Sequence, residues 1–249
     1  MPLEILKGWM NIVEVIQETP DTKTLRIELT KPINFVPGQF VMAGLELEPG
    51  ETIPGKSKDS GQKKLVKRAF SIASSPTEKE HIDLTFNLNP GGQLSPHLYS
   101  VKEGGLVYIE GPYGKFNFRQ DQSKHHVFLG AGTGITPLMS MLRFGKAKNL
   151  PGGKTLIYSV KTPENIVYKK ELIGLQKSGL RLFITITRPE NSGWTGLTGR
   201  IDKKMISETV GDLSDAVFYM CGPPEMVEST VKILEELGIP KERINREQW

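Results

Sequence analysis

The sequence has few cysteines, few histidines and no long hydrophobic run. Its single cysteine, Cys221, excludes a disulfide within the chain, and one thiolate cannot hold an iron–sulfur cluster, which normally takes four cysteine ligands. The four histidines, His81, His97, His125 and His126, never fall at zinc-ligand spacings with cysteines or carboxylates, so no metal site is predicted. A redox function would therefore depend on a group other than a metal cluster of the chain's own.

A membrane span and a nucleic-acid-binding surface are not indicated either. No window approaches about twenty consecutive apolar residues, so no helix is expected to cross a bilayer. The segment 1–15 lacks the basic stretch, apolar run and cleavage site of a secretory signal, which predicts a cytoplasmic location. The net charge of +4 is too small to indicate nucleic-acid binding, although a basic excess would favour an acidic partner.

The hydrophobic pattern changes near residue 122. Before it, short alternating runs such as TKTLRIEL and HIDLTFNL are separated by glycine and proline, which is typical of antiparallel strands. After it, apolar runs such as HVFLG, TLIYSV and AVFYMC alternate with the predicted helices ITPLMSMLRFG, YKKELIGLQKSG and PEMVESTVKILEELG. The 249 residues therefore predict two domains: an antiparallel β-barrel over 1–122 and a doubly wound parallel α/β sheet over 123–249.

The segment GAGTGITP, residues 130–137, is the strongest candidate for binding a ligand. It follows an apolar strand and opens a helix, so its glycines would let the backbone approach a pyrophosphate at the helix N-terminus. The spacing departs from G-x-G-x-x-G, and a tight turn also needs glycine for steric reasons. On this segment alone, phosphate binding and a steric role are equally supported.

A second candidate lies at the end of the strand AVFYMC, where Cys221 and Gly222 lead into Pro223 and a helix. Ligands of open α/β sheets lie outside the carboxyl ends of the strands, so Cys221 could face the same crevice as Thr133. Taken alone, a small buried cysteine followed by prolines at early helix positions is the better-supported interpretation.

Two segments of the first half have similar potential. In KRAFSIASSP, Arg68, Phe70 and Ser71 offer a charge for a phosphate, a stacking face and a hydroxyl donor, although an amphipathic strand with one core phenylalanine would look the same. In NPGGQLSPHL, a Gly–Gly turn before Ser95 can form an anion nest, and an ordinary β-turn is equally consistent.

The order and spacing of these segments together resemble the ferredoxin–NADP(+) reductase superfamily, most closely its bacterial ferredoxin or flavodoxin reductases. The resemblance covers nearly the whole chain and rests on RAFSIAS, GGQLS, GPYGKF, GAGTGITP, CGPPEM and the aromatic last residue, Trp249. It implies that the barrel binds FAD and that the α/β domain binds NAD(P).

The resemblance also implies roles for single residues. Those implied to hold FAD are Arg68, Ala69, Phe70, Ser71, Phe86, Asn87, Gly92, Gln93, Leu94, Ser95, Thr136 and Trp249. Those implied to contact the nucleotide are Gly132, Thr133, Gly134, Cys221, Gly222 and Pro223. Those implied to lie at the reacting atoms are Ser71, Cys221, Glu247 and Trp249. Phe70 replaces the family's usual tyrosine, which keeps ring stacking but removes a phenol hydrogen bond.

The coenzyme is predicted from charge. NAD-binding sites tend to place an acid at the end of the second strand, whereas a 2′-phosphate requires arginine or lysine. Here Lys161 follows TLIYSV, Arg188 follows the third strand and Arg200 ends WTGLTGR, all at positions where NADP-specific bacterial relatives carry basic residues. NADP(H) is therefore favoured over NAD(H), which stays open.

The implied activity is hydride exchange between nicotinamide C4 and flavin N5, followed by one-electron transfer to a separate iron–sulfur or flavodoxin-type carrier. An acidic carrier would suit the basic segment 55–68, although a solvated linker is equally consistent. One alternative is an NAD(P)H-dependent reductase component of an oxygenase or another multi-subunit redox complex. Another is a non-catalytic flavin subunit, which the retained GAGTGITP and CGPP segments argue against.

Overall fold

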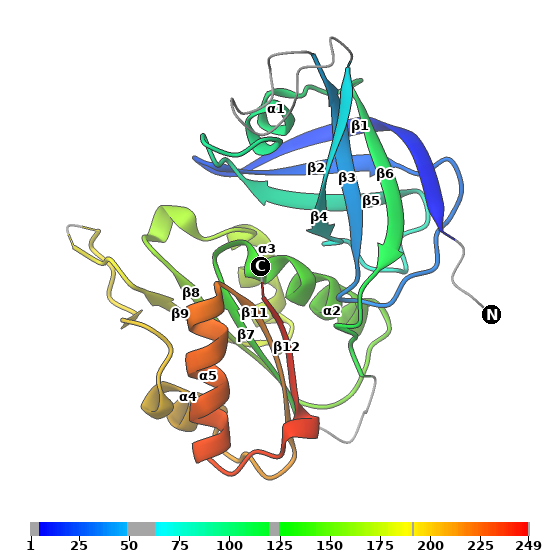
Figure 1. The fold of residues 1–249 in the computed structure, drawn as a ribbon. Coiled ribbons are helices and arrows are strands. Elements are labelled where there is room, and N and C mark those ends of the chain that lie inside the picture. The colour runs from blue at the N-terminus through cyan, green and yellow to red at the C-terminus, as the bar shows by residue number, and fades with distance from the viewer. Residues whose placement is uncertain (1–4, 49–62, 120–124, 191, 249) are drawn as a thin grey trace.

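The computed structural model describes residues 5–48, 63–119, 125–190 and 192–248 (Figure 1). Within these ranges the chain forms an antiparallel sheet of six strands followed by a parallel sheet of six strands. The predicted order of the two fold types is confirmed. The predicted domain boundary between residues 122 and 123 lies outside the described residues and stays a prediction.

The first sheet curves into a half-barrel. Its strands are β1 (Leu6–Thr19), β2 (Thr22–Glu28), β3 (Phe40–Leu47), β4 (Lys64–Ser71), β5 (His81–Asn87) and β6 (Leu106–Tyr113), paired in the order β4-β3-β6-β1-β2-β5. An antiparallel bridge between Ile72 and Leu84 draws the two edges of the sheet together. Along the first part of β1, Leu6, Met10 and Ile12 are buried while their neighbours face outward, as the period of two predicts. The short helix α1 (Ser95–Ser100) adds Leu98 to this core.

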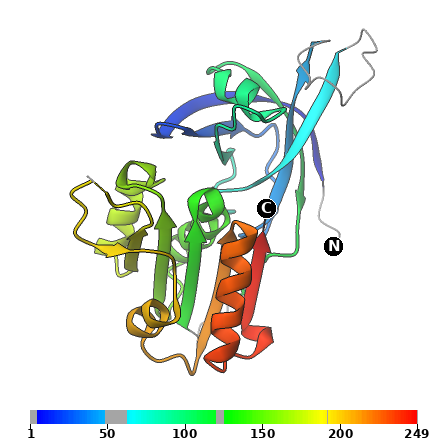
Figure 2. The same ribbon diagram turned by 60° about the vertical axis from the view of Figure 1, so that its left-hand side comes forward.

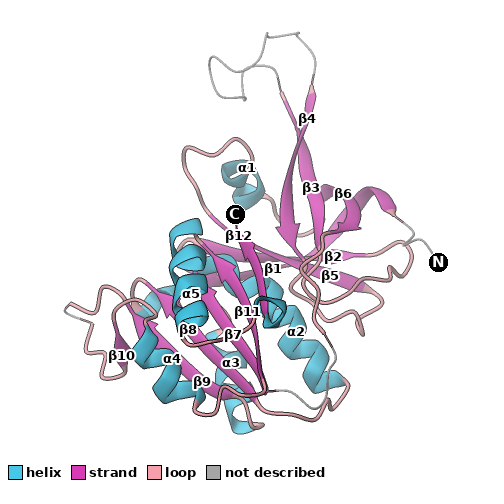
Figure 3. Cartoon of the chain, turned by 60° about the horizontal axis from the view of Figure 1, so that its bottom comes forward, coloured by secondary structure: helices cyan, strands magenta, loops and turns pink. Residues whose placement is uncertain are grey.

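The second sheet is parallel throughout. Its strands are β7 (His125–Ala131), β8 (Lys154–Val160), β9 (Arg181–Ile186), β10 (Leu197–Thr198), β11 (Ala216–Gly222) and β12 (Ile244–Gln248), in the order β10-β9-β8-β7-β11-β12. Its helices are α2 (Ile135–Ala147), α3 (Lys169–Lys177), α4 (Lys203–Val210) and α5 (Pro224–Glu236). The helices cover both faces (Figures 2 and 3): Leu142 of α2 and Leu172 of α3 share one apolar core, and Ile206 of α4 and Leu234 of α5 share the other.

The three predicted helices are confirmed as α2, α3 and α5. The strand β12 was not predicted, because INREQ is mostly polar and shows no alternating apolar pattern, although all five of its residues pair along β11. Among the described residues, no helix is both long and apolar enough to pass through a bilayer.

Candidate functional site

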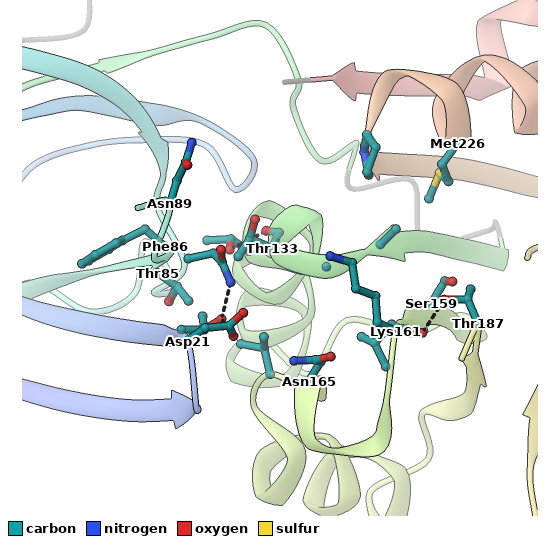
Figure 4. A pocket seen from close by; sticks show the side chains of 18 of the residues that line it. Asp21, Thr85, Phe86, Asn89, Thr133, Ser159, Lys161, Asn165, Thr187 and Met226 are labelled. Atoms are coloured by element: carbon teal, nitrogen blue, oxygen red, sulfur yellow. Dashed lines mark hydrogen bonds between the residues drawn. The ribbon is translucent and has the colours of Figure 1, made fainter. Parts of the chain in front are cut away.

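A cleft of about 1160 Å³ lies between the half-barrel and the parallel sheet (Figure 4). Its wall combines the ends of β4 and β5 with the carboxyl ends of β7 and β8 and the start of α5. The strand order of the parallel sheet reverses between β7 and β11, and ligands of such sheets bind at this reversal, outside the carboxyl ends of the strands. The cleft exceeds the about 300–1,000 Å³ of ordinary small-molecule sites, so it has room for ligands larger than a single small metabolite.

Most of the residues singled out in the sequence line this cleft. They are Ala69, Phe70, Ser71, Phe86, Asn87, Gly132, Thr133, Thr136, Lys161, Arg188, Arg200, Pro223 and Glu247. Those that do not form part of its wall are Arg68, Gly92, Gln93, Leu94, Ser95, Gly134, Cys221 and Gly222. Trp249 lies outside the described residues. The fold thus brings candidates from both halves to one cavity, and the ligand contact of each residue stays a prediction.

The turn between β7 and α2 is a 3₁₀ segment, Gly132–Gly134, that leads directly into the helix. Gly132 has a φ of +54°, a left-handed conformation that favours glycine. A Cβ on Gly134 would lie 2.2 Å from the carbonyl oxygen of Cys221, so β11 can approach the turn only because residue 134 has no side chain. No side chain caps the first turn of α2, which leaves its N–H groups suited to an anion. The steric and the anion-binding interpretations therefore both fit this turn.

Cys221 supports the turn through its main chain. Its side chain is only 1% exposed and belongs to the apolar core under α2 and α3. Pro223, two residues further on, does reach the cleft wall. The predicted contact of Cys221 with a nicotinamide remains a prediction, and the structure gives its backbone a packing role.

On the barrel side, β4 and the loop before α1 are hydrogen-bonded to each other. Arg68 Nη2 donates to Oε1 of Gln93 at 2.7 Å. Ser95 Oγ accepts from the N–H of Asn89 at 2.9 Å and donates to the carbonyl of the same residue at 3.0 Å, which closes the loop. The guanidinium of Arg68 is therefore held beside the Gly–Gly turn, as a shared phosphate site would require.

Two aromatic residues of the barrel line the cleft. The rings of Phe70 and Phe86 meet nearly edge to face, with centroids 5.8 Å apart. Ser71, the last residue of β4, pairs with Phe40 of β3, and both line the cleft. This part of the wall offers an apolar ring and a hydroxyl, which suit a flat heterocycle with polar edges.

Three basic side chains line the other end of the cleft. Lys161 follows β8, Arg188 follows β9, and Arg200 follows β10. The N–H of Arg188 donates to the carbonyl of Lys161 at 2.8 Å, which fixes the two strand ends side by side. A phosphate group bound at this part of the wall could pair with positively charged side chains.

Sequence reasoning missed several residues of the wall. Asp21 lies in the β1–β2 turn, Thr22 begins β2, and Glu225, Met226 and Ser229 lie on one face of α5. Burial acts to raise the pKa of Asp21, but hydrogen bonds from Asn87, Thr19 and Thr22 outweigh it and lower the pKa. The i, i+1, i+4 spacing on α5 directly after CGPP was a usable signal, whereas nothing in the turn ETPDTKT indicates a site.

Glu247 is the one carboxylate of β12 that reaches the cleft, and it pairs with Cys221 along β11. Burial raises the pKa of its carboxyl from 4.5 to about 7. Near neutral pH this group can therefore hold or release a proton, which a carboxyl in water does not do.

Replacing Glu247 with glutamine should make the protein more stable at pH 8 and leave it unchanged at pH 4. The folded protein keeps the proton up to about pH 7, whereas the unfolded chain releases it near 4.5, so the stability from the protonated form is complete below 4.5 and lost as the pH rises through 7. We expect Glu247→Gln to gain about 1–2 kcal/mol at pH 8, a figure reduced for the partial exposure of the carboxyl. Thermal unfolding at both pH values measures it, with the exposed Glu208→Gln of α4 as control. An equal gain at both pH values would contradict the raised pKa.

Two family models match the chain. The oxidoreductase FAD-binding domain matches residues 10–118, and the oxidoreductase NAD-binding domain matches residues 128–232. Among curated proteins, the glycine betaine monooxygenase reductase subunit of Chromohalobacter salexigens is 30% identical over 95% of this chain and 62% of its own length. NADH-cytochrome b5 reductase 1 of Aspergillus oryzae is 32% identical over 80% of this chain and 71% of its own length. The chain thus spans less than two thirds of the monooxygenase reductase subunit.

Solved structures show the same architecture. A ferredoxin NADP+ reductase from Neisseria gonorrhoeae with bound FAD and NADP superposes with a TM-score of 0.79 at 23% identity, covering 97% of this chain and 98% of that one. The ferredoxin reductase in carbazole 1,9a-dioxygenase superposes with a TM-score of 0.82 at 25% identity, covering 100% of this chain and 70% of that one. Both halves of the chain therefore have counterparts of known fold in the same order.

Proposed function

The chain belongs to the ferredoxin–NADP(+) reductase superfamily of FAD-dependent oxidoreductases, and we propose that it passes electrons from NADPH through FAD to a separate one-electron carrier. The observation that carries this proposal is the shared cleft, into which Phe70 and Ser71 of the barrel and Gly132 and Thr133 of the α/β unit all open. Direct hydride transfer requires the reacting atoms to be about 3–3.5 Å apart, so both binding elements must meet in one cavity.

The barrel side of the cleft fits FAD. In its wall, Phe70 offers a face for a flat ring and Ser71 a hydroxyl at its edge. Arg68, which lies outside the wall on the same strand and is held by Gln93, offers a charge for phosphates. When bound, FAD would supply a hydride acceptor at N5 and would release the electrons singly. The role that the resemblance implies for Trp249 stays a prediction, because this residue lies outside the described residues.

The α/β side fits a pyridine nucleotide. The uncapped start of α2 suits its pyrophosphate, and Lys161, Arg188 and Arg200 suit a 2′-phosphate, which supports NADPH. The cytochrome b5 reductase relatives are named for NADH, so NADH is the competing coenzyme. The basic side chains in the cleft wall are the observation that favours NADPH.

Glu247 is proposed to take up and release a proton at the cleft. Its carboxyl lies in the cleft wall on the strand beside Cys221, and burial lifts its pKa to about 7. At that pKa the carboxyl can take up or deliver a proton as charge at the flavin changes. The rest of the wall holds the two ligands in contact and keeps water away.

The electron acceptor is proposed to be a separate iron–sulfur protein or flavodoxin, in the cytoplasm. The net charge of +4 favours an acidic partner, since opposite charge steers encounter. Of the basic segment 55–68, residues 55–62 lie outside the described residues, and Lys63, Lys64, Lys67 and Arg68 lie within them. The names of the monooxygenase and dioxygenase reductase relatives support a second candidate acceptor, an oxygenase component.

Purified protein should be yellow and should lose its flavin absorbance anaerobically when NADPH is added. The expected spectrum follows from FAD held in the barrel side of the cleft, and the released flavin can be identified after heat denaturation. A colourless protein that takes up no FAD on reconstitution would end the flavoenzyme proposal. Titrating the reduced protein with ferredoxin, flavodoxin and an oxygenase component then separates the two candidate acceptors.

A further inference from the structure

The half-barrel and the α/β unit are joined by a cluster of polar contacts next to the cleft. Figure 1 shows α2 and α3 on the side of the parallel sheet that faces the barrel. The hydroxyl of Ser140 on α2 donates to the carbonyl of Ser74 at 2.7 Å, and both residues are fully buried. Two further residues of the α/β unit, Arg143 and Tyr168, also form hydrogen bonds with the half-barrel. We call Arg143, Tyr168 and their barrel partners, which are Ala73, Asp83, Thr85 and Glu18, the latch.

Arg143 of α2 reaches both units at once. Its Nη1 donates to the carbonyl of Ala73 in the barrel at 2.9 Å and lies 3.7 Å from a carboxylate oxygen of Asp83. Its Nε and Nη2 form a bidentate pair with Glu171 of α3, at 2.9 and 2.6 Å. Burial disfavours the charged form, but the hydrogen bonds to Glu171, together with the electrostatic attraction of Tyr168, Glu171 and Asp83, outweigh it and hold the pKa of Arg143 above its ordinary value. This cation is therefore permanent, and removing Glu171 would take the bidentate partner from a mostly buried guanidinium.

Tyr168, just before α3, closes a ring of hydrogen bonds across the interface. Its hydroxyl is hydrogen-bonded to the hydroxyl of Thr85, which contacts Thr24 at 2.6 Å, and Thr24 donates to Glu18 at 2.8 Å. The other carboxylate oxygen of Glu18 accepts the N–H of Tyr168 at 3.2 Å. The guanidinium of Arg143 lies over the tyrosine ring, 5.0 Å from its centroid.

The backbone of Tyr168 is strained to allow this. Its φ of +56° is left-handed, which costs a bulky residue about 1–2 kcal/mol. The side chain is only 4% exposed. Such a conformation persists only where the surrounding contacts over-determine it, so the ring of hydrogen bonds fixes the position of this residue.

The latch lies next to the wall of the cleft on both sides of the interface. On the barrel side, Thr85 and its neighbour Phe86 on β5 both line the cleft. On the other side, Val167, the residue before Tyr168, also lines it. Arg143 lies two turns of α2 after Thr136, which also lines it. The latch therefore joins the strand that carries the flavin side of the site to the helix that carries the nucleotide side.

We infer that Tyr168 and Arg143 are positioning residues, which set the separation between the flavin side and the nucleotide side of the cleft without contacting either ligand. This inference rests on the proposed function. A displacement of about 1 Å between reacting groups can slow a reaction by about 100-fold, so a loosened latch affects the transfer step far more than ligand binding.

The test uses the FAD-loaded protein with Tyr168→Phe and, as a second variant, Arg143→Lys. We expect the limiting rate of flavin reduction to fall about 10-fold while the Kd for NADPH changes by less than about 2-fold. The charge-transfer absorbance between nicotinamide and flavin should weaken. Without coenzyme, small-angle scattering should show a larger radius of gyration than for the wild type, which reports the geometry independently of activity.

Matched controls change the same groups away from the interface. Tyr108→Phe removes a hydroxyl on the outside of the barrel, 3.4 Å from Glu110. Arg181→Lys alters a guanidinium that binds the carbonyls of Thr209 and Val210 within the α/β unit. Both should keep the wild-type rate and radius.

Two results would overturn the latch. One is a wild-type rate and radius in both latch variants, and the other is a lowered melting temperature with neither rate nor radius changed. A wild-type protein that no pyridine nucleotide reduces would instead refute the proposed function, and the scattering of the variants would still decide the latch.

Discussion

Gly134→Ala is expected to abolish most of the flavin reduction by NADPH and to lower stability by about 3 kcal/mol. The new methyl group would meet the carbonyl of Cys221 at 2.2 Å, and neither backbone can yield as a flexible side chain would. For a protein of this size the loss corresponds to a fall of about 10 °C in melting temperature. Pushing the turn away from β11 would also misplace the start of α2, so we expect the reduction rate to fall about 100-fold.

Gly174→Ala is the matched control for this substitution. Gly174 lies within helix α3, and a Cβ there meets nothing within 4 Å. Alanine should therefore raise stability by about 0.4–1 kcal/mol and leave reduction unchanged. Calorimetry and stopped-flow reduction measure both variants. Gly134→Ala with wild-type stability would show that β11 does not pack against the turn as described.

Arg200→Ala should raise the KM for NADPH about 10-fold and leave that for NADH unchanged. The side chain lines the cleft beside Lys161 and Arg188, and a charge-assisted hydrogen bond to a phosphate contributes about 1.5–3 kcal/mol. Only NADPH carries the 2′-phosphate, so the loss is specific to it. Combining Arg200→Ala with Arg188→Ala should extend the effect to about 100-fold if the two contacts are independent.

Steady-state kinetics with both coenzymes, at fixed ionic strength, check this prediction. Lys177→Ala at the exposed end of α3 is the control, because it removes a positive charge outside the cleft wall. An equal rise in the KM for NADPH and for NADH would show that Arg200 contacts a part of the molecule that both coenzymes share. An unchanged preference for NADPH would remove Arg200 from the site.

Local sequence patterns were enough to predict most of the helices and strands. The alternating runs TKTLRIEL and HIDLTFNL correspond to β2 and β5, and the three predicted helices correspond to α2, α3 and α5. The strand β12 was not predicted, because this mostly polar edge strand does not alternate between apolar and polar residues. The basic residues after β8 and β9 could be anticipated because parallel strands end at one edge of the sheet.

Contacts between distant segments could not be anticipated in the same way. Arg68 and Gln93 are 25 positions apart, and the sequence offered both only as separate candidates. Nothing in the sequence around Tyr168 links it to Glu18, which is 150 positions away. The neutral-range pKa of Glu247 depends on burial, and a polar strand such as INREQ does not predict burial.

By itself, the sequence determined the two fold types, their order and the glycine-rich turn, because hydrophobic period and glycine placement act within a few residues. The tertiary structure alone decided that both ligand-binding elements share one cleft and that burial raises the pKa of Glu247. It also decided that Arg143 and Tyr168 join the two units. These features depend on how two sheets pack against each other, and packing brings together residues that no local pattern relates.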